Sequence, residues 1–455
     1  MNWKKAFVCK VGFPAFFRRD DFGEIFRQIS ILEESQHNNI DLLLERQLYS
    51  ARKIMIHAYE TTAYYKKVFV ESGFDPYKFN DFSLLKTIPL LNKNIIRERS
   101  EDLIASNLKN SELHFSETGG TTGVKMKFWR DNACLIKKEA ARYRFEKWTG
   151  WDFGDWIGIV WPAQADYVGH WTYKSRIKNA MTKREVVFPA AVIDDHLIQE
   201  YIDTLVKREP TAIRAFSSPL LEIAQFMLKY DRPVRGIKGI ITTGEPLFEH
   251  QRKTIEEAFG VKVLNSYRTR EAGSIAQECE KQDGMHINSD GLYIELVDDE
   301  EDPSTGQSVG KIVITDLWNY GMPLIRYDIG DYGSFLQGQC TCGRVLPRLG
   351  HIAGRVADTL VTPTNRRVSA MSLVLYLVDE APGLVGQVQV VQDAIDHLII
   401  RTTKDPPVTE EIKKYQLNSI HTLFGEEMRV TFEEVDRIDR EPTGKYRFVI
   451  SRLSV

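Results

Sequence analysis

The fold of this chain is decided by a short stretch rich in glycine and threonine, Thr118-Gly119-Gly120-Thr121-Thr122-Gly123-Val124-Lys125. Glycines let a backbone turn sharply and bring its N–H groups close to a ligand, and successive inward-pointing N–H groups bind anions. Threonine hydroxyls add donors and Lys125 adds a positive charge, so the stretch suits a polyphosphate. Clusters of this composition are also ordinary turns, and the stretch alone does not choose between the two interpretations.

The residues around this Gly/Thr loop distinguish it from other phosphate-binding loops. Residues 113–116 resemble a strand that enters the loop, and residues 127–129 resemble a strand that leaves it. A Walker loop requires serine or threonine after its lysine, whereas Met126 follows Lys125 here. Walker and Rossmann loops also lead from a strand into a helix. We therefore predict a loop between two strands, followed by a helix over residues 132–145.

Length and composition exclude several classes of protein. The chain has 455 residues, of which 43% are hydrophobic, enough for two or three domains. Its 60 basic and 63 acidic residues leave a net charge of −3, which indicates neither a nucleic-acid nor an anionic-membrane partner. Five cysteines argue against a disulfide framework and favour a reducing compartment. No run approaches the roughly 18 apolar residues of a membrane span, so we expect a cytoplasmic protein.

The order of elements predicts an α/β fold. Residues 20–75 have a helical apolar period, and from residue 195 to 275 strands alternate with helices, which favours a largely parallel sheet. Residues 236–243, 261–264 and 324–327 are among the predicted strands, so residues 244–246 and 265–271 are expected just after strands. Beyond Gly354 the pattern is that of a small α+β unit. We expect a large N-terminal α/β domain over residues 1–354, with a helical extension to about residue 110, and a small mobile α+β lid domain over residues 355–455.

Five of the eight tryptophans lie between residues 148 and 171. Most of them are expected to be core residues. However, Trp161 and Pro162 end a predicted strand, and His170 and Trp171 lie in the loop that follows. Ligands of α/β proteins bind at strand ends. These four residues are therefore candidate walls of a substrate pocket.

Further motifs follow the Gly/Thr loop in a definite order: Gly244-Glu245-Pro246, residues 265–271 (Asn-Ser-Tyr-Arg-Thr-Arg-Glu), residues 325–331 (Ile-Arg-Tyr-Asp-Ile-Gly-Asp), residues 354–358 (Gly-Arg-Val-Ala-Asp) and residues 442–445 (Pro-Thr-Gly-Lys). In this order and spacing they resemble the adenylate-forming superfamily of acyl-CoA synthetases. The most similar branch is the phenylacetate–CoA ligase-like group, which includes the coenzyme F390 synthetase and capsule-protein relatives. The resemblance spans nearly the whole chain.

The resemblance implies a reaction in which a carboxylate attacks the α-phosphorus of ATP, giving acyl-AMP and pyrophosphate. Such transfers rely on positioning and charge neutralisation. The Gly/Thr loop would hold the β- and γ-phosphates. The nucleotide would also contact the Gly244-Glu245-Pro246 turn and Arg355, which would lie near the ribose or phosphates. Coenzyme A would then take the acyl group.

The same resemblance assigns roles to five side chains. Tyr267 would stack on adenine, Thr269 would reach the α-phosphate, and Glu271 would hold Mg²⁺, a cation that prefers carboxylate and phosphate oxygens. Asp331 would accept hydrogen bonds from the ribose, and Lys445 would neutralise charge that develops on the transferred phosphate. Each residue alone also has an ordinary explanation: a helix start for Glu271, a turn for Asp331 and a solvated charge for Lys445.

Asp358 lies where the hinge of this family falls, at the connection to the lid that would carry Lys445 in and out. Three positions depart from the usual motifs. Val124 stands where the family has proline before the loop lysine, Arg268 stands where glycine usually follows the tyrosine, and Ile329 replaces a threonine. The threonine at 269 also comes one residue early, which weakens its assignment. We expect an unusual acyl substrate.

Four residues are candidate zinc ligands. Cys279 and His286 are separated by six residues, and Cys340 and Cys342 by one. Thiolates with one imidazole suit tetrahedral zinc. The alternative is a set of unrelated buried thiols and a surface histidine. Some members of the phenylacetate–CoA ligase-like branch carry a structural zinc at matching positions, and the resemblance therefore favours zinc.

The sequence thus predicts ATP-dependent activation of a small aromatic or apolar carboxylic acid, then transfer to coenzyme A. An amine or a protein is the alternative acceptor. A nucleotide-binding homologue without catalysis is a further alternative, although it would have no need to keep Glu271 and Lys445. The resemblance also suggests a homodimer.

Overall fold

The structure is a computed structural model of the chain. It describes residues 3–12, 15, 24–117, 126–161, 173–190, 193–301, 308–355, 360–364, 367–368, 373, 377, 387–404, 407–439 and 448–453. The Gly/Thr loop, Asp358 and Lys445 lie outside these ranges, as do Pro162, His170 and Trp171 of the predicted pocket. Within a few described strands the side chains are not described, and Arg355 is one of these.

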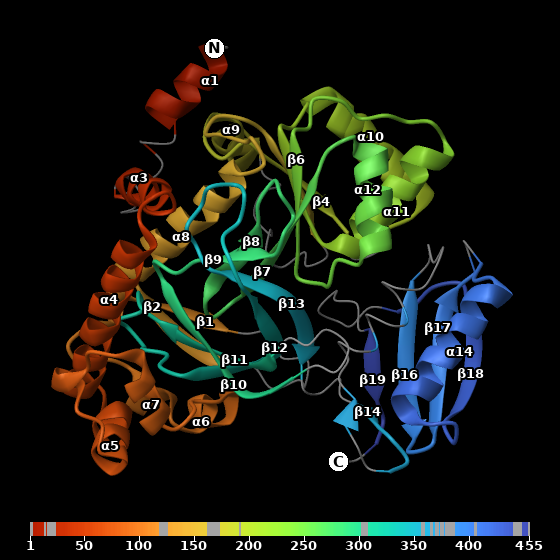
Figure 1. Cartoon of the computed structure of the whole chain (residues 1–455). Helices are drawn as coiled ribbons and strands as arrows, with labels where there is room; N and C mark the ends of the chain where they lie inside the picture. The colour runs from red at the N-terminus through yellow and green to blue at the C-terminus, as the bar shows by residue number, and fades with distance from the viewer. Residues whose placement is uncertain are drawn as a thin grey trace.

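The main body is built on one sheet that has 11 strands within the described ranges, in the order β10-β11-β12-β13-β9-β8-β7-β6-β5-β3-β4 (Figure 1). Strands β4, β3, β5, β6 and β7 pair in parallel, which confirms the predicted α/β pattern. The remaining pairs are antiparallel. The strands are β3 Ile157–Trp161, β4 Glu185–Pro189, β5 Ala212–Ala215, β6 Gly239–Thr243, β7 Val263–Thr269, β8 Gly273–Glu278, β9 Met285–Ile287, β10 Leu292–Glu301, β11 Ser308–Asp316, β12 Tyr327–Leu336 and β13 Arg348–Arg355.

Helices α10 Asp195–Arg208, α11 Ser217–Lys229 and α12 Glu249–Phe259 pack on one face of the parallel strands (Figure 1). Helix α8 Asn132–Lys147 packs against β8 and the N-terminal helix α3. It follows β2 Lys127–Asp131, which pairs antiparallel with β1 Leu113–Glu117. The two strands that enter and leave the Gly/Thr loop are therefore confirmed, as is the helix that follows them.

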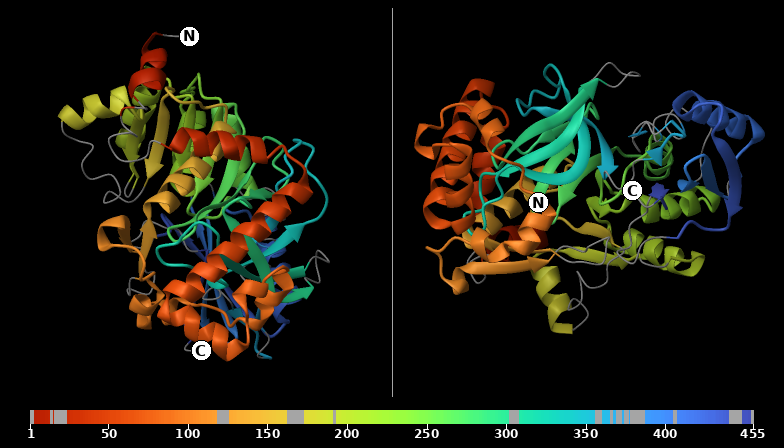
Figure 2. Two further views of the ribbon diagram at one scale, coloured as in Figure 1. Left: turned by 90° about the vertical axis from the view of Figure 1, so that its left-hand side faces the viewer. Right: turned by 90° about the horizontal axis from the view of Figure 1, so that it is seen from below.

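N-terminal helices form a layer beside the antiparallel strands, on the side opposite the C-terminal unit (Figure 2). Helix ends are set by side-chain caps: Asn39 accepts from the N–H of Asp41 at the start of α4, and Thr62 accepts from the N–H of Tyr65 at the start of α5. The helices before β2 are α1 Trp3–Phe7, which lies apart from this layer near α9 (Figure 1), the π-helix Val8–Gly12, α3 Ile25–Ser35, α4 Ile40–Thr61, α5 Ala63–Ser72, α6 Lys93–Glu98, α7 Ser100–Leu103 and the 3-10 helices Pro76–Lys78, Phe82–Thr87 and Asn110–Glu112.

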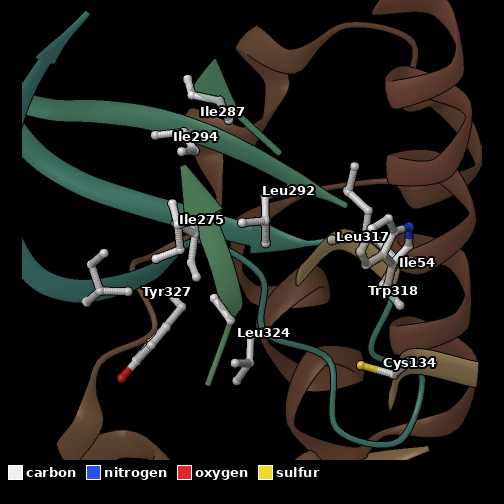
Figure 3. Packing of buried hydrophobic residues seen from close by; sticks show 14 of the residues in the cluster. Ile54, Cys134, Ile275, Ile287, Leu292, Ile294, Leu317, Trp318, Leu324 and Tyr327 are labelled. Carbon is white, nitrogen blue, oxygen red and sulfur yellow. The ribbon is translucent and has the colours of Figure 1, made fainter. Parts of the chain in front are cut away.

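The main core lies between this helical layer and the antiparallel strands. Ile54 of α4 packs beside Leu317 and Trp318, in the same cluster as Leu292 of β10 (Figure 3). The buried Tyr65 hydroxyl donates to the carbonyl of Pro323 (3.1 Å) and accepts from the N–H of Ile325 (2.9 Å). The helices thereby hold the segment that leads into β12, the strand that carries Asp331.

The C-terminal part has its own sheet and core. Strands β18 Arg429–Val435, β17 His397–Thr403, β16 Val388–Ala394 and β19 Val449–Ser451 form a four-stranded sheet, next to helix α14 Glu410–Phe424 (Figure 1). A small pair, β14 Leu360–Val361 and β15 Arg367–Val368, precedes them. The core of this unit includes Phe248, whose ring lies 5.5 Å from that of Phe448. The boundary at residues 354/355 stays a prediction.

Two motif assignments are corrected by the sheet. Tyr267 and Thr269 were expected after a strand, but both lie within β7, because the hairpin partner β8 extends that strand to Thr269. The predicted strand over residues 324–327 is wrong in its bounds, since β12 runs from Tyr327 to Leu336 and contains Asp331. In both cases antiparallel pairing with a distant or following strand prolongs the extended backbone.

The helix α9 Tyr173–Met181 lies beyond β3. No helix in the described part of the chain is long and apolar enough to cross a membrane.

Candidate adenylation site and zinc site

Two of the predicted nucleotide residues meet across the main sheet. The Tyr267 hydroxyl donates to the Asp331 carboxylate at 2.6 Å, although β7 and β12 are separated by three other strands. Asp331 also stands opposite Arg355 in the β12–β13 register. The sheet therefore brings a tyrosine ring, a carboxylate and the backbone of Arg355 to one place.

Glu271 lies in the turn between β7 and β8, and its side chain is buried. One carboxylate oxygen lies 3.3 Å from the hydroxyl of the buried Tyr327. The backbone carbonyl of Glu271 accepts from Lys138 Nζ at 2.6 Å, and Lys138 also pairs with the buried Asp316 at 2.6 Å. The alternative that Glu271 begins a helix is wrong, because a hairpin turn holds it.

Thr269 helps to shape the same turn. Its hydroxyl oxygen accepts from the N–H of Ala272 at 3.1 Å. The hydroxyl can still donate its own proton, so a contact with a phosphate oxygen remains open to it.

The Gly244-Glu245-Pro246 turn follows β6, as predicted. Gly244 has φ +83° and no room for a side chain, because a Cβ there would lie 2.5 Å from the Phe216 ring. The Glu245 carboxylate accepts from the N–H (3.0 Å) and hydroxyl (2.7 Å) of Ser218 in the first turn of α11. A carboxylate at a helix N-terminus is stabilised there, so Glu245 positions the turn.

A cavity of about 500 Å³ opens between β1, β2, α8 and the β7–β8 hairpin. This is an ordinary size for a small-molecule site. Trp161, a predicted pocket residue, and Thr269, a predicted nucleotide residue, share it, and the Trp161 ring packs edge-on against Phe216. The lining residues are Ser116, Glu117, Phe128, Arg130, Leu135, Lys138, Glu139, Arg142, Trp161, Arg268, Thr269, Arg270, Gly273 and Ser274.

Five charged side chains cluster at the wall of the cavity and are called here the arginine network: Glu139, Arg142, Glu146, Arg214 and Arg268. Arg142 pairs with Glu139 and, at 2.6 Å, with Glu146, and Arg214 pairs with Glu146 as well. Burial alone would raise the pKa of Glu146, but Arg142 and Arg214 lower it. In the same way Arg142 overcomes the effect of burial and lowers the pKa of Glu139 to about 2. Both carboxylates are therefore ionised at neutral pH.

Sequence reasoning missed most of this network. A signal was present in α8, where Lys138, Arg142 and Glu146 follow one another at intervals of four and so lie on one helix face. On a surface helix that pattern indicates a solvated stripe. Only the packing of α8 against the sheet shows that the face is buried.

Replacing Glu146 by glutamine is expected to lower the free energy of unfolding by about 3 kcal/mol, because two guanidinium groups lose a buried partner. The Glu146 side chain is only 1% exposed. Urea unfolding measures the change. Glu71→Gln is the matched control, since its pair with Lys67 is exposed and should matter by less than about 0.5 kcal/mol. Equal effects of the two substitutions would contradict the prediction.

The four candidate zinc ligands come together at one point. Their ligand atoms all lie within 4.8 Å of one another. Cys279 Sγ and Cys340 Sγ are 3.7 Å apart, and Cys342 Sγ is 3.3 Å from His286 Nε2. Tetrahedral zinc with bonds of about 2.3 Å to sulfur and 2.0 Å to nitrogen would separate these pairs by about 3.8 and 3.5 Å.

The surroundings of the cluster also fit a metal. His286 is fully buried, and burial lowers its pKa to about 4, which keeps the ring neutral. His286 Nδ1 lies 3.0 Å from the carbonyl oxygen of Leu346, so Nδ1 carries the proton and Nε2 offers its lone pair. The N–H groups of Lys281 and Arg344 donate to Cys279 and Cys342, each at 3.4 Å. The alternative with a surface histidine is wrong.

Comparisons with known proteins agree with this geometry. The family model of the CapK C-terminal domain matches residues 360–452. Among curated proteins, a phenylacetate-coenzyme A ligase of Thermus thermophilus is 25% identical over 92% of this chain and 98% of that protein. Protein CapK of Staphylococcus aureus is 23% identical over 81% of this chain and 80% of its own. These matches confirm the predicted resemblance to phenylacetate–CoA ligases and CapK.

The fold of this chain is also similar to that of a solved acid–CoA ligase. A crystal structure of 2-hydroxyisobutyryl-CoA ligase in the postadenylation state, in complex with an acyl-AMP (R3-HIB-AMP), superposes with a TM-score of 0.70. It is 21% identical, and the match covers 89% of this chain and 88% of that one. The predicted fold class, a large α/β body with a C-terminal domain, is confirmed.

Proposed function

We propose that this protein is an AMP-forming acid–CoA ligase. It activates a small carboxylic acid with ATP to acyl-AMP and then transfers the acyl group to coenzyme A. The observation that carries the proposal is the Tyr267–Asp331 hydrogen bond at 2.6 Å, beside a cavity lined by Thr269. Two motifs 64 residues apart meet there, and relatives named phenylacetate-coenzyme A ligase support the same activity.

The roles of the nucleotide residues follow from their placement. In the proposal, Tyr267 stacks on adenine while its hydroxyl holds Asp331, so that the carboxylate is aimed at the ribose hydroxyls. Glu271, in the turn next to Thr269, takes Mg²⁺ between its carboxylate and the phosphates. The Gly/Thr loop, which connects β1 to β2, holds the β- and γ-phosphates. Arg355 stands opposite Asp331 and completes the nucleotide site.

The acyl group is expected in the cavity beside Trp161. Phe128, Leu135 and Trp161 supply apolar surface there, which supports an aromatic or apolar portion of the acid. The cavity is also lined by Arg268, whose buried Nε and Nη2 atoms have no hydrogen-bond partner among the described residues.

We also propose that Cys279, His286, Cys340 and Cys342 bind a structural zinc ion. With four protein ligands the metal has no open position and takes no part in the chemistry. It would tie the segment after β8 to the segment between β12 and β13.

The first test is ATP–pyrophosphate exchange with a panel of acids, followed by thioester formation with coenzyme A. Acid-dependent exchange supports adenylation, and the absence of exchange with every acid would leave only the inactive nucleotide-binding homologue. If exchange occurs but coenzyme A is not acylated, amines and acceptor proteins are supplied in its place. Product formation with these would identify the alternative acceptor.

Asp331→Asn is expected to raise KM for ATP about tenfold, because a hydrogen bond to a charged acceptor is worth about 1.5–3 kcal/mol. The measurement is exchange at varied ATP concentration. Asp328→Asn is the matched control: it lies on the same strand, and its carboxylate accepts from the N–H of Gly330. An unchanged KM for Asp331→Asn, or the same rise in both variants, would contradict the ribose assignment.

A further inference from the structure

The cavity beside Trp161 has more positive than negative charge. Its lining includes five cationic side chains, Arg130, Lys138, Arg142, Arg268 and Arg270, against two carboxylates, Glu117 and Glu139. Lys138 is neutralised by Asp316 behind the wall, and Arg142 by Glu139 and Glu146. These two cations are therefore structural, and Arg130 and Arg270 donate to Ser116 and to the carbonyl of Glu117, which leaves Arg268 to be considered.

Arg268 is the least compensated member of the arginine network. Its Nε and Nη2 atoms are buried, and neither has a hydrogen-bond partner among the described residues. The network counts three guanidinium groups but only two carboxylates, and both carboxylates are bound by Arg142 or Arg214. Because buried donors without a partner are costly, the Nε and Nη2 groups of Arg268 favour a further anion beyond the two carboxylates of the network.

Arg268 and Tyr267 serve different ends of the site. The Tyr267 hydroxyl donates a hydrogen bond to Asp331 of β12. The charged groups that act most strongly on Arg268 are instead Arg214, Glu146 and Arg142, which lie on β5 and α8. Neighbouring side chains of a strand point to opposite faces, and the β7–β8 pairing is irregular between these two residues. Arg268 lines the cavity, whereas Tyr267 and Asp331 are not among its lining residues.

We propose that the acid activated by this protein carries a second carboxylate, which Arg268 binds at the inner end of the cavity. This inference rests on the proposed ligase function. One carboxylate would attack the α-phosphorus and release pyrophosphate; its own charge is lost in the acyl carbonyl of the mixed anhydride, while the α-phosphate keeps a negative charge. The second carboxylate keeps its charge throughout, so it can neutralise Arg268 before and after adenylation. Phe128, Leu135 and Trp161 contact the carbon chain or ring between the two groups.

The chemistry of the guanidinium favours a carboxylate as the second anion. Its planar fork matches the two oxygens of a carboxylate, and such paired hydrogen bonds are stronger than neutral ones. A family member with the usual glycine at this position would offer no such group. The arginine at 268 therefore selects among acids, in contrast to the nucleotide residues, which all substrates share.

The test compares three acids of equal chain length: a dicarboxylate, its monomethyl ester and the matching monocarboxylate with a terminal methyl group. ATP–pyrophosphate exchange gives KM for each, and calorimetry gives the affinity of each acid without turnover. We expect KM and Kd for the dicarboxylate to be lower by about thirtyfold or more than for the ester, as befits a buried charged contact. Arg268→Met should remove this preference, and Arg268→Lys should keep part of it.

Arg232→Met, which removes a surface arginine that pairs with Asp203, is the control, and thermal unfolding verifies that each variant is folded.

Equal affinity of wild type for the dicarboxylate and its ester overturns the inference, as does a preference that survives in Arg268→Met. If the monocarboxylate alone supports exchange, the ligase function stands and the inference fails. If the dicarboxylate binds through Arg268 but no acid supports exchange, the inference stands and the ligase function fails. A phosphonate analogue that outcompetes the dicarboxylate also overturns it.

Discussion

Replacing Lys445 by alanine is expected to lower acid-dependent ATP–pyrophosphate exchange by about a thousandfold, the usual cost of removing one group that stabilises transition-state charge. The role comes from the Pro442-Thr443-Gly444-Lys445 motif, which lies outside the described residues. The loss should appear in kcat, because the lysine acts on charge that develops only during the transfer.

The two half-reactions provide the control for Lys445. Thioester formation from supplied acyl-AMP and coenzyme A should be unchanged in Lys445→Ala, since the proposed lid moves this lysine away before that step. ATP affinity, measured by calorimetry, should change by no more than a few-fold. Lys404→Ala is a matched surface variant: Lys404 is an exposed lysine of the C-terminal unit that pairs with Asp436. Normal exchange in Lys445→Ala, or equal loss in both half-reactions, would rule out the lid mechanism.

Loss of the zinc site is expected to have the largest effect on stability. The purified protein should contain about one equivalent of zinc, and Cys340→Ser should remove it and lower the free energy of unfolding by more than about 5 kcal/mol, because structural zinc contributes folding free energy directly. Metal analysis and urea unfolding measure the two effects. A chelator should lower the Tm of the wild type toward that of the variant.

Cys9→Ser is the matched control for the zinc prediction. The Cys9 thiol donates to the carbonyl of Phe153 at 2.8 Å, and a serine hydroxyl can make the same bond. This variant should keep its metal and its Tm. Less than about 0.2 equivalents of any metal in the purified wild type would contradict the proposal of a structural zinc site.

Local sequence predicted the elements around the site well. The strand–loop–strand arrangement at residues 113–129, the helix of α8 and the alternation from residue 195 onward depend on apolar periodicity and turn residues, which neighbouring positions encode. Strand ends were predicted less well at β7 and β12, where pairing with β8, β11 and β13 sets the bounds. Those partners are identified by the register of the sheet, which local propensity does not specify.

Residue types also indicated the four candidate zinc ligands, because cysteine and histidine have few other reasons to gather. Only the fold could place Cys340 at 3.7 Å from Cys279, since 61 residues separate them. The buried charged residues, in contrast, could not be recognised from residue type. Arginine and glutamate are ordinary on helix surfaces, so the spacing of four in α8 did not by itself mark Glu146 as buried.

The stretch from Thr118 to Lys125 shows most clearly which features the local sequence determines and which depend on the tertiary structure. By itself the sequence determined a glycine-rich loop between two strands and, with the later motifs in order, the adenylate-forming resemblance. The tertiary structure decided which distant side chains of the described residues meet: Tyr267 bonds to Asp331, and Arg268 lines the cavity with its buried Nε and Nη2 atoms without a hydrogen-bond partner there. The physical reason is that turns and periods are short-range properties of the chain, whereas the balance of buried charge depends on which distant side chains the sheet brings within a few ångströms.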